Sequence, residues 1–393
     1  MENSFVHLHA HTEYSMLDGA AKIEPFLNRI LELEQPGAAI TDHGNLYGAL
    51  EFYNSAIKKK LKPIIGYEAY VISDSRFERP DRKNNKRYHL TLLAENTEGY
   101  WNLVEMASKA FTEGYYYKPR IDYELLKKYS EGIIALSGCL GGEIAQLLAP
   151  DGSVEEGNQG QTRSFDDALK KAEFYQSIFG ENNFFIELHK HGIKQQEDIL
   201  PDLLKISEKL SAPLVATNDS HYVHSDDASA HDALLCVQTN ATLDDENRFK
   251  FDGSGFYIKS SEEMRDLFPN EKFPDACNNT LKILDRVEYE FEKDTYYLPD
   301  FPIEDSSKNV DEYLKEKVYQ GAESLYGELS SELEERINYE LEVIESMGFA
   351  SYFLIVGDLI NYAKSNGIRT GAGRGSAAGS IVSYCLGITG IEP

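Results

Sequence analysis

The segment Phe5-Val6-His7-Leu8-His9-Ala10-His11-Thr12 carries the most information about the fold and chemistry of this chain. Its polar and apolar residues alternate as in a β-strand, where residues i and i+2 point to the same face. His9 and His11 can therefore converge on one cation, and Asp18 follows seven residues after His11. A single HxH pair is weak support for a metal site, because such pairs also occur by chance.

Further potential metal ligands stand where short apolar strands would end in loops. They lie in Thr41-Asp42-His43-Gly44, Gly66-Tyr67-Glu68, Tyr88-His89-Leu90, Ser137-Gly138-Cys139 and Thr217-Asn218-Asp219-Ser220-His221. Each one alone could be an ordinary polar residue at a strand end. Chance explains the whole set poorly, since seven of the ten histidines lie in or beside these segments. Imidazole, carboxylate and thiolate ligands together indicate a multinuclear centre able to act on a phosphate diester.

The composition limits the classes of protein to consider. A length of 393 residues suggests two domains, and 41% hydrophobic residues suffice for a core. No apolar run has the length of a membrane span, and the four cysteines lack CxxC spacing, so we expect a cytoplasmic protein without disulfides. The net charge of −27 would repel nucleic acid. A role on DNA must then rest on a local site or on parts of a longer protein.

Up to about residue 230, short apolar segments alternate with helical stretches. The expected strands are 37–40, 63–65, 133–136, 184–188 and 214–216, and the expected helices include 23–34, 46–60 and 196–210. Strand–helix alternation predicts parallel strands and an α/β barrel. The candidate ligands follow the carboxyl ends of the strands, where parallel barrels keep their active sites.

Two loops interrupt this pattern. Residues 73–87 contain the densest basic run of the chain: Arg76, Arg79, Arg82, Lys83, Lys86 and Arg87. This run is either a flexible, solvated loop or a loop that guides a nucleic-acid strand to the metal site. Residues 151–164 are rich in Gly, Gln and Ser and predict a mobile insertion without chemistry.

From about residue 285 the sequence becomes mainly helical, with helices expected over 310–326, 331–347 and up to residue 364. The run from Gly371 to Ser380 then opens a short helix that ends near residue 386. Glycines before a helix can present backbone N–H groups to phosphate, and Arg374 could pair with it. The run lacks the Gly-Lys-Ser/Thr ending of a P-loop.

These segments resemble known families closely. Val6–Gly19, Ala39–Gly48, Gly66–Glu68, Leu136–Glu143 and Ala216–Tyr222 resemble the polymerase and histidinol phosphatase (PHP) domain. Gly114–Arg120, Phe256–Ser260 and Tyr352–Gly379 resemble the N-terminal part of bacterial DNA polymerase III alpha subunits, the C-family replicative polymerases. The resemblance implies an α/β fold: a distorted (β/α)7 PHP barrel over residues 1–284, then the mainly helical start of the polymerase palm over residues 285–393.

The resemblance also implies a metal site with up to three divalent ions (zinc, manganese or iron). One metal would be held by His9, His11, Glu68 and Asp219, a second by Glu68, His89 and Cys139, and a third by Asp18, His43 and His221. Catalysis would rest on Glu68 as the bridging ligand, with Asp219, His9 and His11. His7 is expected to support the ligands, the HxH pair within 187–191 to bind no metal, and His224 and His231 to lie at the surface.

The implied activity of the PHP domain is a 3′–5′ exonuclease for proofreading, in which a metal-activated water attacks the terminal phosphodiester. In the parent DNA-directed DNA polymerase, which uses magnesium, Gly373, Arg374, Gly375, Ser376 and Ser380 would contact the incoming triphosphate. No acidic polymerase motif follows Gly371, so we expect no polymerisation by this chain.

The implied partners are the 3′ primer end of DNA, the rest of the alpha subunit, the sliding clamp and other holoenzyme subunits, at the nucleoid and away from membranes. Two other functions stay open. The barrel could be a scaffold stabilised by metals without catalysis, or a PHP phosphatase acting on small phosphate esters. The phosphatase is disfavoured by residues 352–380, which a single-domain enzyme would not need.

Overall fold

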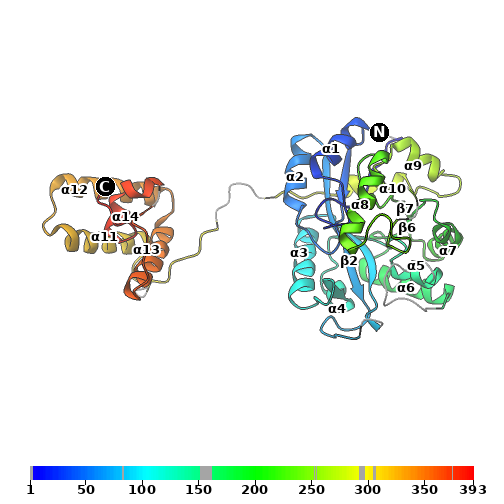
Figure 1. The fold of residues 1–393 in the computed structure, drawn as a ribbon, viewed down its shortest axis with the longest axis horizontal. Helices are drawn as coiled ribbons and strands as arrows, with labels where there is room; N and C mark the ends of the chain where they lie inside the picture. Colours follow the sequence, from blue (N-terminus) through cyan, green and yellow to red (C-terminus); the bar gives the residue numbers. More distant parts are fainter. Residues whose placement is uncertain are drawn as a thin grey trace. The chain divides into compact units, whose positions relative to one another are not determined.

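The computed structural model describes all residues except 1–2, 82–83, 151–161, 252, 254, 292–296, 304–306 and 374. The chain forms two compact units, Met1–Glu290 and Phe291–Pro393 (Figure 1). The boundary predicted after residue 284 falls inside helix α10 (Asn278–Arg286), which packs against strand β7 (Leu214–Ala216) of the first unit. Most of the insertion predicted at 151–164 lies outside the described residues.

A curled sheet forms the centre of the first unit. Its strands run in the order β1 (Gly37–Ile40), β2 (Lys62–Ile72), β3 (Tyr88–Ala94), β5 (Ile133–Leu136), β6 (Phe184–Leu188) and β7, with β4 (Arg120–Asp122) beside β2. The expectation of parallel strands fails at β3, which is antiparallel to both β2 and β5. The reason for the β2–β3 pairing lies in the connection, because the described residues of the β2–β3 loop contain no crossover helix, which a parallel pair would need.

The N-terminal segment lies between the two ends of the sheet. On one side, Ala39 N donates to His7 O at 2.7 Å and Thr41 N to Ala10 O at 2.8 Å. On the other side, His11 N donates to Ser220 O at 2.7 Å, just beyond β7. These bonds join β1 to the segment after β7 and so complete the distorted barrel, which confirms the predicted α/β fold.

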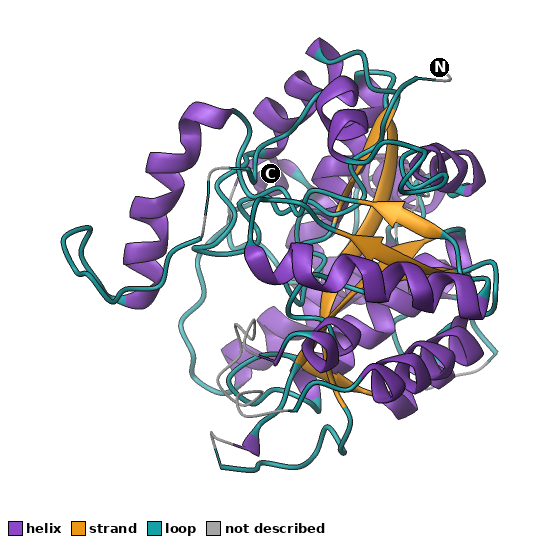
Figure 2. Ribbon diagram, turned by 90° about the vertical axis from the view of Figure 1, so that its right-hand side faces the viewer, coloured by secondary structure: helices purple, strands orange, loops and turns teal. Residues whose placement is uncertain are grey.

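Helices surround the strands (Figures 1 and 2). They are α1 (Ile23–Glu32), α2 (Ala49–Lys58), α3 (Thr97–Thr112), α4 (Tyr123–Lys128), α5 (Glu143–Leu148), α6 (Phe165–Phe179), α7 (Lys194–Leu210), α8 (Ala228–Thr239), α9 (Ser261–Leu267) and α10. In α1 the buried residues are Ile23, Phe26, Leu27 and Ile30, a spacing that places them on one stripe. Such apolar stripes bury the helices against the sheet.

The interior of the barrel has an apolar part and a polar part. Ile64, Leu8 and Leu136 pack with Ile283 of α10 in one buried cluster. Glu68 stands four residues after Ile64 on β2, and the period of two in a strand gives both side chains the same facing. The same strand therefore carries the apolar filling and, toward its carboxyl end, a candidate ligand.

The second unit is helical. It contains α11 (Val310–Tyr326), α12 (Ser331–Ser346), α13 (Ala350–Ser365), the 3-10 turn Gly375–Gly379 and α14 (Ile381–Cys385). The side chain of Asn309 caps α11 and that of Ser330 caps α12. The buried cluster of this unit is apolar and includes Leu314, Val318 and Ile337. Within the described residues no single helix is long and apolar enough to cross a membrane; α12 and α13, bent by 114°, pass only as a pair, by length and composition.

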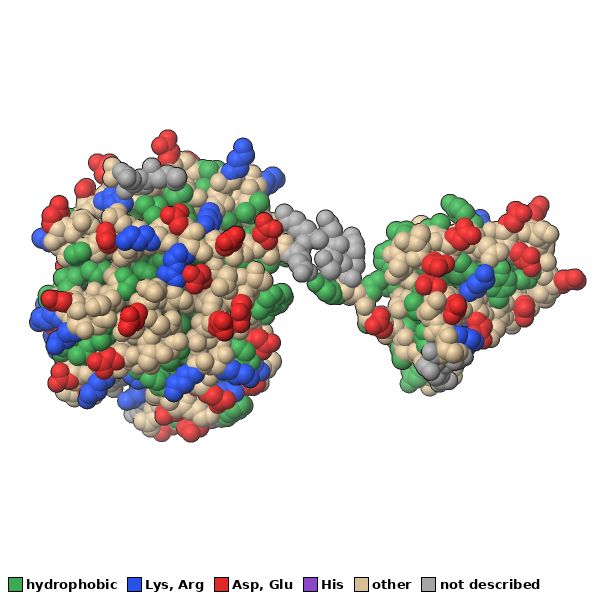
Figure 3. Space-filling view, turned by 180° about the vertical axis from the view of Figure 1, so that it is seen from behind, with side chains coloured by type: hydrophobic (Ala, Val, Ile, Leu, Met, Phe, Trp, Pro, Cys, Tyr) green, Lys and Arg blue, Asp and Glu red, His purple; other side chains and the backbone are tan. Residues whose placement is uncertain are grey.

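The basic loop is tied to the barrel at its first two arginines. Arg76 is buried and pairs with Glu113 (Nε–Oε2 2.6 Å) and Asp122 (Nη1–Oδ2 3.0 Å). Arg79 donates to the main-chain carbonyls of Arg76 and Glu113. Arg82 and Lys83 lie outside the described residues. These contacts make Arg76 an internal support of the loop. On the face of the first unit that Figure 3 shows, acidic and basic side chains are interspersed.

Candidate metal centre

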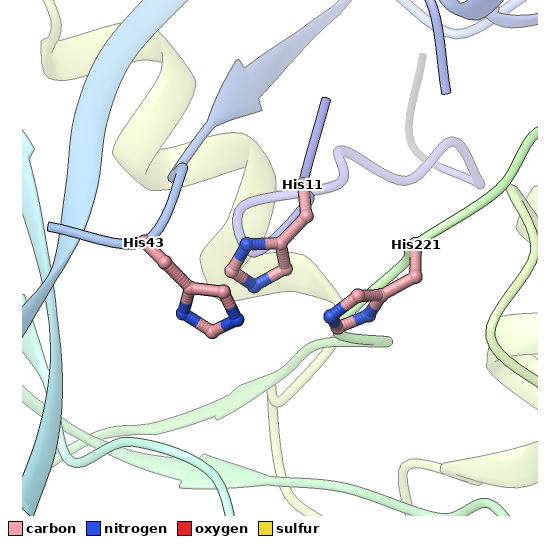
Figure 4. Close-up of side chains that lie close together, drawn as sticks. All are labelled: His11, His43 and His221. Carbon is pink, nitrogen blue, oxygen red and sulfur yellow. The ribbon is translucent and has the colours of Figure 1, made fainter. Parts of the chain in front are cut away.

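The nine predicted ligands gather at one end of the barrel. Seven of them line a cavity of about 360 Å³: Asp18, His43, Glu68, His89, Cys139, Asp219 and His221. His9 and His11 adjoin it through Glu68 and Asp219. Figure 4 shows the rings of His11, His43 and His221 facing one common space from three separate segments.

Glu68 lies at the centre of this cluster. Its Oε1 is 3.1 Å from His89 Nδ1 and 3.4 Å from His9 Nε2. Its Oε2 is 2.6 Å from His43 Nδ1 and 3.6 Å from His11 Nε2. Cys139 Sγ approaches Oε1 at 3.6 Å. A carboxylate whose two oxygens face different groups of ligands has the arrangement required of a bridging ligand.

Hydrogen bonds determine which ring nitrogen carries the proton in His9 and His221. His9 Nδ1 donates to Glu187 Oε1 at 2.7 Å, because an ionised carboxylate can only accept. His221 Nδ1 donates to the carbonyl of Asp219 at 2.8 Å. When each ring is neutral, as it must be to bind a metal, Nε2 keeps its lone pair and points into the cluster.

His11 is oriented through a short chain of hydrogen bonds. The hydroxyl of Ser15 donates to Asp42 Oδ1 at 2.9 Å, so its oxygen accepts from His11 Nδ1 at 2.9 Å. Among the described residues, the buried Nε2 atoms of His9, His11 and His221 have no well-formed hydrogen bond. Three oriented lone pairs without partners next to carboxylates fit divalent cations, which neutral imidazole and carboxylate bind well.

Asp219 occupies an unusual backbone conformation. Its φ of 42° lies in the left-handed region, which is costly for a residue with a side chain. Its Oδ1 lies 3.1 Å from His11 Nε2 and 3.4 Å from His9 Nε2. The neighbouring Asn218 holds the segment by donating to the carbonyls of Gly255 and Tyr257. The strain therefore places a carboxylate against two histidines.

The buried charges at this site favour a cation. Burial alone raises the pKa of Glu68, yet His89, His43 and His9 hold that pKa well below its usual range. Burial, together with the nearby imidazoles of His43 and His221, lowers the pKa of His11 to about 3. The carboxylates are thus ionised while His11 is neutral, and these are the protonation states in which the two groups bind metals.

Glu187 is a functional residue that the sequence analysis missed. Besides holding His9, its carboxylate accepts from Thr217 Oγ1 at 2.6 Å and from Gly138 N at 2.9 Å. A charged residue inside the apolar strand Phe184–Leu188 was the available signal. His189, one member of the HxH pair within 187–191, lies 3.1 Å from Glu187, the carboxylate that holds His9.

Two expectations about other histidines need correction. His231 is buried, not at the surface, and its Nε2 lies 2.8 Å from the carbonyl of Asp18. His7 does not contact the ligands and instead pairs with the carbonyl of Lys259 at 2.9 Å. The chain bends at His9, which interrupts the strict alternation that placed His7 on the ligand face.

The glycine-rich segment of the second unit has its own internal partners. Ser380 Oγ donates to Glu340 at 2.8 Å, and the N–H groups of Ile381 and Val382 also donate to Glu340, at 3.3 and 3.2 Å. Gly373 and Gly375 have positive φ, Ser376 is exposed, and Arg374 lies outside the described residues. The triphosphate contacts expected here stay a prediction.

Two protein-family models match parts of this chain. Residues 7–191 match the PHP domain family, and residues 312–393 match the family described as bacterial DNA polymerase III alpha NTPase domain. Among solved structures, an amidohydrolase from Chromobacterium violaceum is 13% identical, with a TM-score of 0.35 over 56% of this chain and 88% of that chain.

Related sequences extend the match to the whole chain. The DNA polymerase III subunit alpha of Mycobacterium tuberculosis (strain CDC 1551 / Oshkosh) is 46% identical over 100% of this chain and 33% of the relative. The subunit of Borreliella burgdorferi is 44% identical over 99% of this chain and 33% of the relative. The subunit of Thermus aquaticus is 40% identical over 99% of this chain and 36% of the relative. The chain spans about a third of the length of these relatives. It therefore belongs to the family of bacterial DNA polymerase III alpha subunits, with a PHP domain in its first unit.

Proposed function

We propose that the first unit is a metal-dependent 3′–5′ exonuclease that removes nucleotides from the primer end of DNA. The observation that carries this proposal is the set of three buried imidazoles whose Nδ1 protons are held elsewhere and whose Nε2 lone pairs converge beside Glu68 and Asp219. A site built in this way suits phosphoester hydrolysis, in which negative charge develops on phosphate oxygens.

The residues present fit up to three divalent cations. One set is His9, His11, Glu68 and Asp219; a second is Glu68, His89 and Cys139; a third is Asp18, His43 and His221. Bound cations would supply Lewis acidity toward a phosphodiester and neutralise its charge. The donor set of nitrogen, oxygen and sulfur suits zinc, manganese or iron and does not select among them.

The protein's own groups orient and protect this chemistry. Glu187 and Ser15 fix the ring planes of His9 and His11, so the ligand geometry is set before substrate arrives. Glu68 is buried to 1% exposure, so its carboxylate is held in place where it would bridge two cations. Lys118 and Lys250 line the cavity and place positive charge where a phosphate would enter.

The same proposal extends to the longer protein. The whole alpha subunit would be a magnesium-dependent DNA-directed DNA polymerase, and residues 291–393 would form the start of its palm. Gly373, Arg374, Gly375, Ser376 and Ser380 would face the incoming triphosphate after Ser380 leaves Glu340. A cytoplasmic location at the nucleoid, and assembly with the sliding clamp and other holoenzyme subunits, belong to this proposal.

A primer-shortening assay tests the exonuclease. A 5′-labelled primer with a 3′ mismatch is annealed to template and incubated with the chelator-stripped chain, with and without Mn²⁺ or Zn²⁺. We expect metal-dependent shortening from the 3′ end by the wild type. The ligand variant Asp219→Asn should lose it, while the exposed carboxylate variant Asp226→Asn should keep it.

Two outcomes would replace the proposal. A chain that binds metal but shortens no DNA end would be a metal-stabilised scaffold. A chain that hydrolyses p-nitrophenyl phosphate but no DNA would be a small-molecule phosphatase. Shortening that persists in Asp219→Asn would point to a contaminating nuclease.

A further inference from the structure

We infer that the cavity beside the metal centre binds the terminal nucleotide of an unpaired 3′ end, with its base stacked on Phe249 and its phosphates near Lys118 and Lys250. This inference rests on the proposed exonuclease and names its substrate class: a single-stranded end whose terminal base is out of the duplex. The cavity would bind the terminal nucleotide whichever of the four bases it carries.

The first observation is a row of aromatic rings that leads from the metal centre to the surface. Phe251 packs edge-on against His221, with ring centroids 4.8 Å apart, and against Phe256 at 4.7 Å. Phe249 meets Phe251 edge-on at 5.9 Å, lines the same cavity and is 42% exposed. We call Phe249, Phe251 and Phe256 the aromatic wall. Its inner rings are fixed by packing, and its outer ring keeps a face open for a base.

The second observation is the position of the lysines. Lys118 and Lys250 both line the cavity, in a chain whose net charge is −27. Lys118 Nζ lies 5.2 Å from the ring centroid of Tyr70, which itself packs against His89 at 5.2 Å. Lys250 adjoins Phe249 in sequence and is exposed. Positive charge therefore stands beside aromatic surface near two different edges of the metal cluster.

This combination selects an unpaired strand end. Aromatic side chains bind single-stranded nucleic acid by stacking, which tolerates every base because each has a π-face. A paired base is already stacked in its duplex and would have to leave it to reach Phe249. Unpairing a mismatched terminal base costs less free energy than unpairing a matched one. Stacking on the aromatic wall would therefore favour the mismatched end, which proofreading must remove. A small phosphate ester would need neither the exposed ring nor the second lysine.

The test compares two oligonucleotides that differ only in the terminal base. Both are single-stranded, and one ends in adenosine while the other ends in an abasic tetrahydrofuran residue. We expect the wild-type chain with Mn²⁺ to remove the adenosine nucleotide about tenfold faster at subsaturating substrate, from the usual worth of one stacked base. Phe249→Leu should bring the ratio of the two rates close to one, and Phe249→Tyr should restore it.

The controls separate stacking from general damage. Trp101 on α3 is 60% exposed and does not line the cavity, so Trp101→Leu should keep the tenfold preference. In binding assays at several salt concentrations, Lys250→Gln should reduce the slope of log K against log salt by about 0.7, the value for one phosphate contact on a single strand.

Failure of the stacking inference and failure of the nuclease proposal look different. If Phe249→Leu slows both oligonucleotides equally, or keeps the preference, the wall does not read the base. If the wild type cleaves neither, the nuclease proposal fails, and binding of the same ends protected by a terminal phosphorothioate still decides the inference. Equal dissociation constants for the adenosine and abasic ends would overturn it.

Discussion

The two units of this chain bury different kinds of residue. The first unit encloses His9, Glu68 and Asp219, whereas the buried polar residues described in the second are Ser383 and Thr389. All ten histidines of the sequence belong to the first unit. Buried ionisable groups cost free energy unless they are paired or bind a metal, while apolar contacts stabilise without a ligand. We therefore expect the stability of the first unit to depend on metal and pH, and that of the second unit on packing alone.

The largest effect is expected when Glu68, at the centre of the candidate metal centre, is changed. Glu68→Gln keeps the size of the side chain but removes the charge that faces four histidines. We expect exonuclease activity to fall by at least about a hundredfold and metal content to drop, because a bridging carboxylate has no substitute here. Primer-shortening rates and elemental analysis of the purified variant measure both. Unchanged metal content would mean that Glu68 is not a ligand.

Removing metal should separate the thermal stabilities of the two units. A ligand present at a hundred times its dissociation constant stabilises the folded state by about 2.7 kcal/mol. We therefore expect chelation to lower the melting temperature of the first unit by about 4–5 °C, and to leave that of the second unit unchanged. Calorimetry of the whole chain with and without chelator gives both transitions. Equal shifts of the two transitions would show that metal does not stabilise the first unit selectively.

Acidification should also act on the first unit. Burial lowers the pKa of His7 and of His231 to about 4 and that of His191 to about 3, below the ordinary value of 6.5. Between pH 6.5 and 4 the unfolded chain then binds more protons than the folded chain, so stability falls as pH falls. His9 and His43, whose pKa values are raised, lose their contribution only at higher pH.

The expected result is a first transition that drops by several degrees between pH 6.5 and 4.5, before most carboxylates titrate. The second unit has no histidine and should melt at nearly the same temperature over this range. Calorimetry on the metal-free chain at half-unit pH intervals measures the difference. A second transition that falls in parallel with the first would show that another group controls acid stability.

A substitution that disturbs packing in the second unit should lower the stability of that unit and leave the first unit unaffected. A Cβ added to Gly321 of α11 would lie 1.9 Å from the carbonyl oxygen of Cys385 of α14, so the two helices would have to separate. We expect Gly321→Ala to destabilise the second unit by about 2 kcal/mol and leave the first unit and its activity unchanged. Gly371→Ala is the matched control, because within the described residues no atom lies within 4 Å of its added Cβ.

Much of the fold followed from local patterns in the sequence. The bounds of β5, β6 and β7 agree with the predicted 133–136, 184–188 and 214–216, because short apolar runs between turns indicate buried strands. The parallel direction expected for the strands was wrong at β3, and the loop expected at residues 73–87, which has no predicted crossover helix, was the signal for an antiparallel pair. The distances within the cluster could not be predicted, because they join segments far apart in the sequence, such as those of His9 and Asp219.

The site residues divide in the same way. The nine candidate ligands were named from a family resemblance, and the structure brings their side chains together. The burial of His231 could have been inferred, since it shares a helical stripe with Leu235 of α8. Burial of His7 away from the ligands could not, because the bend at His9 has no mark in the sequence.

The smallest effect is expected when Glu187, which accepts a hydrogen bond from the candidate ligand His9, is changed. Glu187→Gln retains the shape of the side chain but replaces the carboxylate that holds His9 Nδ1 with a neutral amide. Loss of such an outer partner typically weakens metal affinity tenfold to a hundredfold. We expect about tenfold weaker metal binding by titration and a smaller loss of activity at saturating metal, with the exposed Glu197→Gln unchanged. Because the second unit has no buried carboxylate–imidazole pair among its described residues, its melting transition should stay the same. A variant that loses the first transition altogether would make Glu187 a folding residue and not a positioning residue.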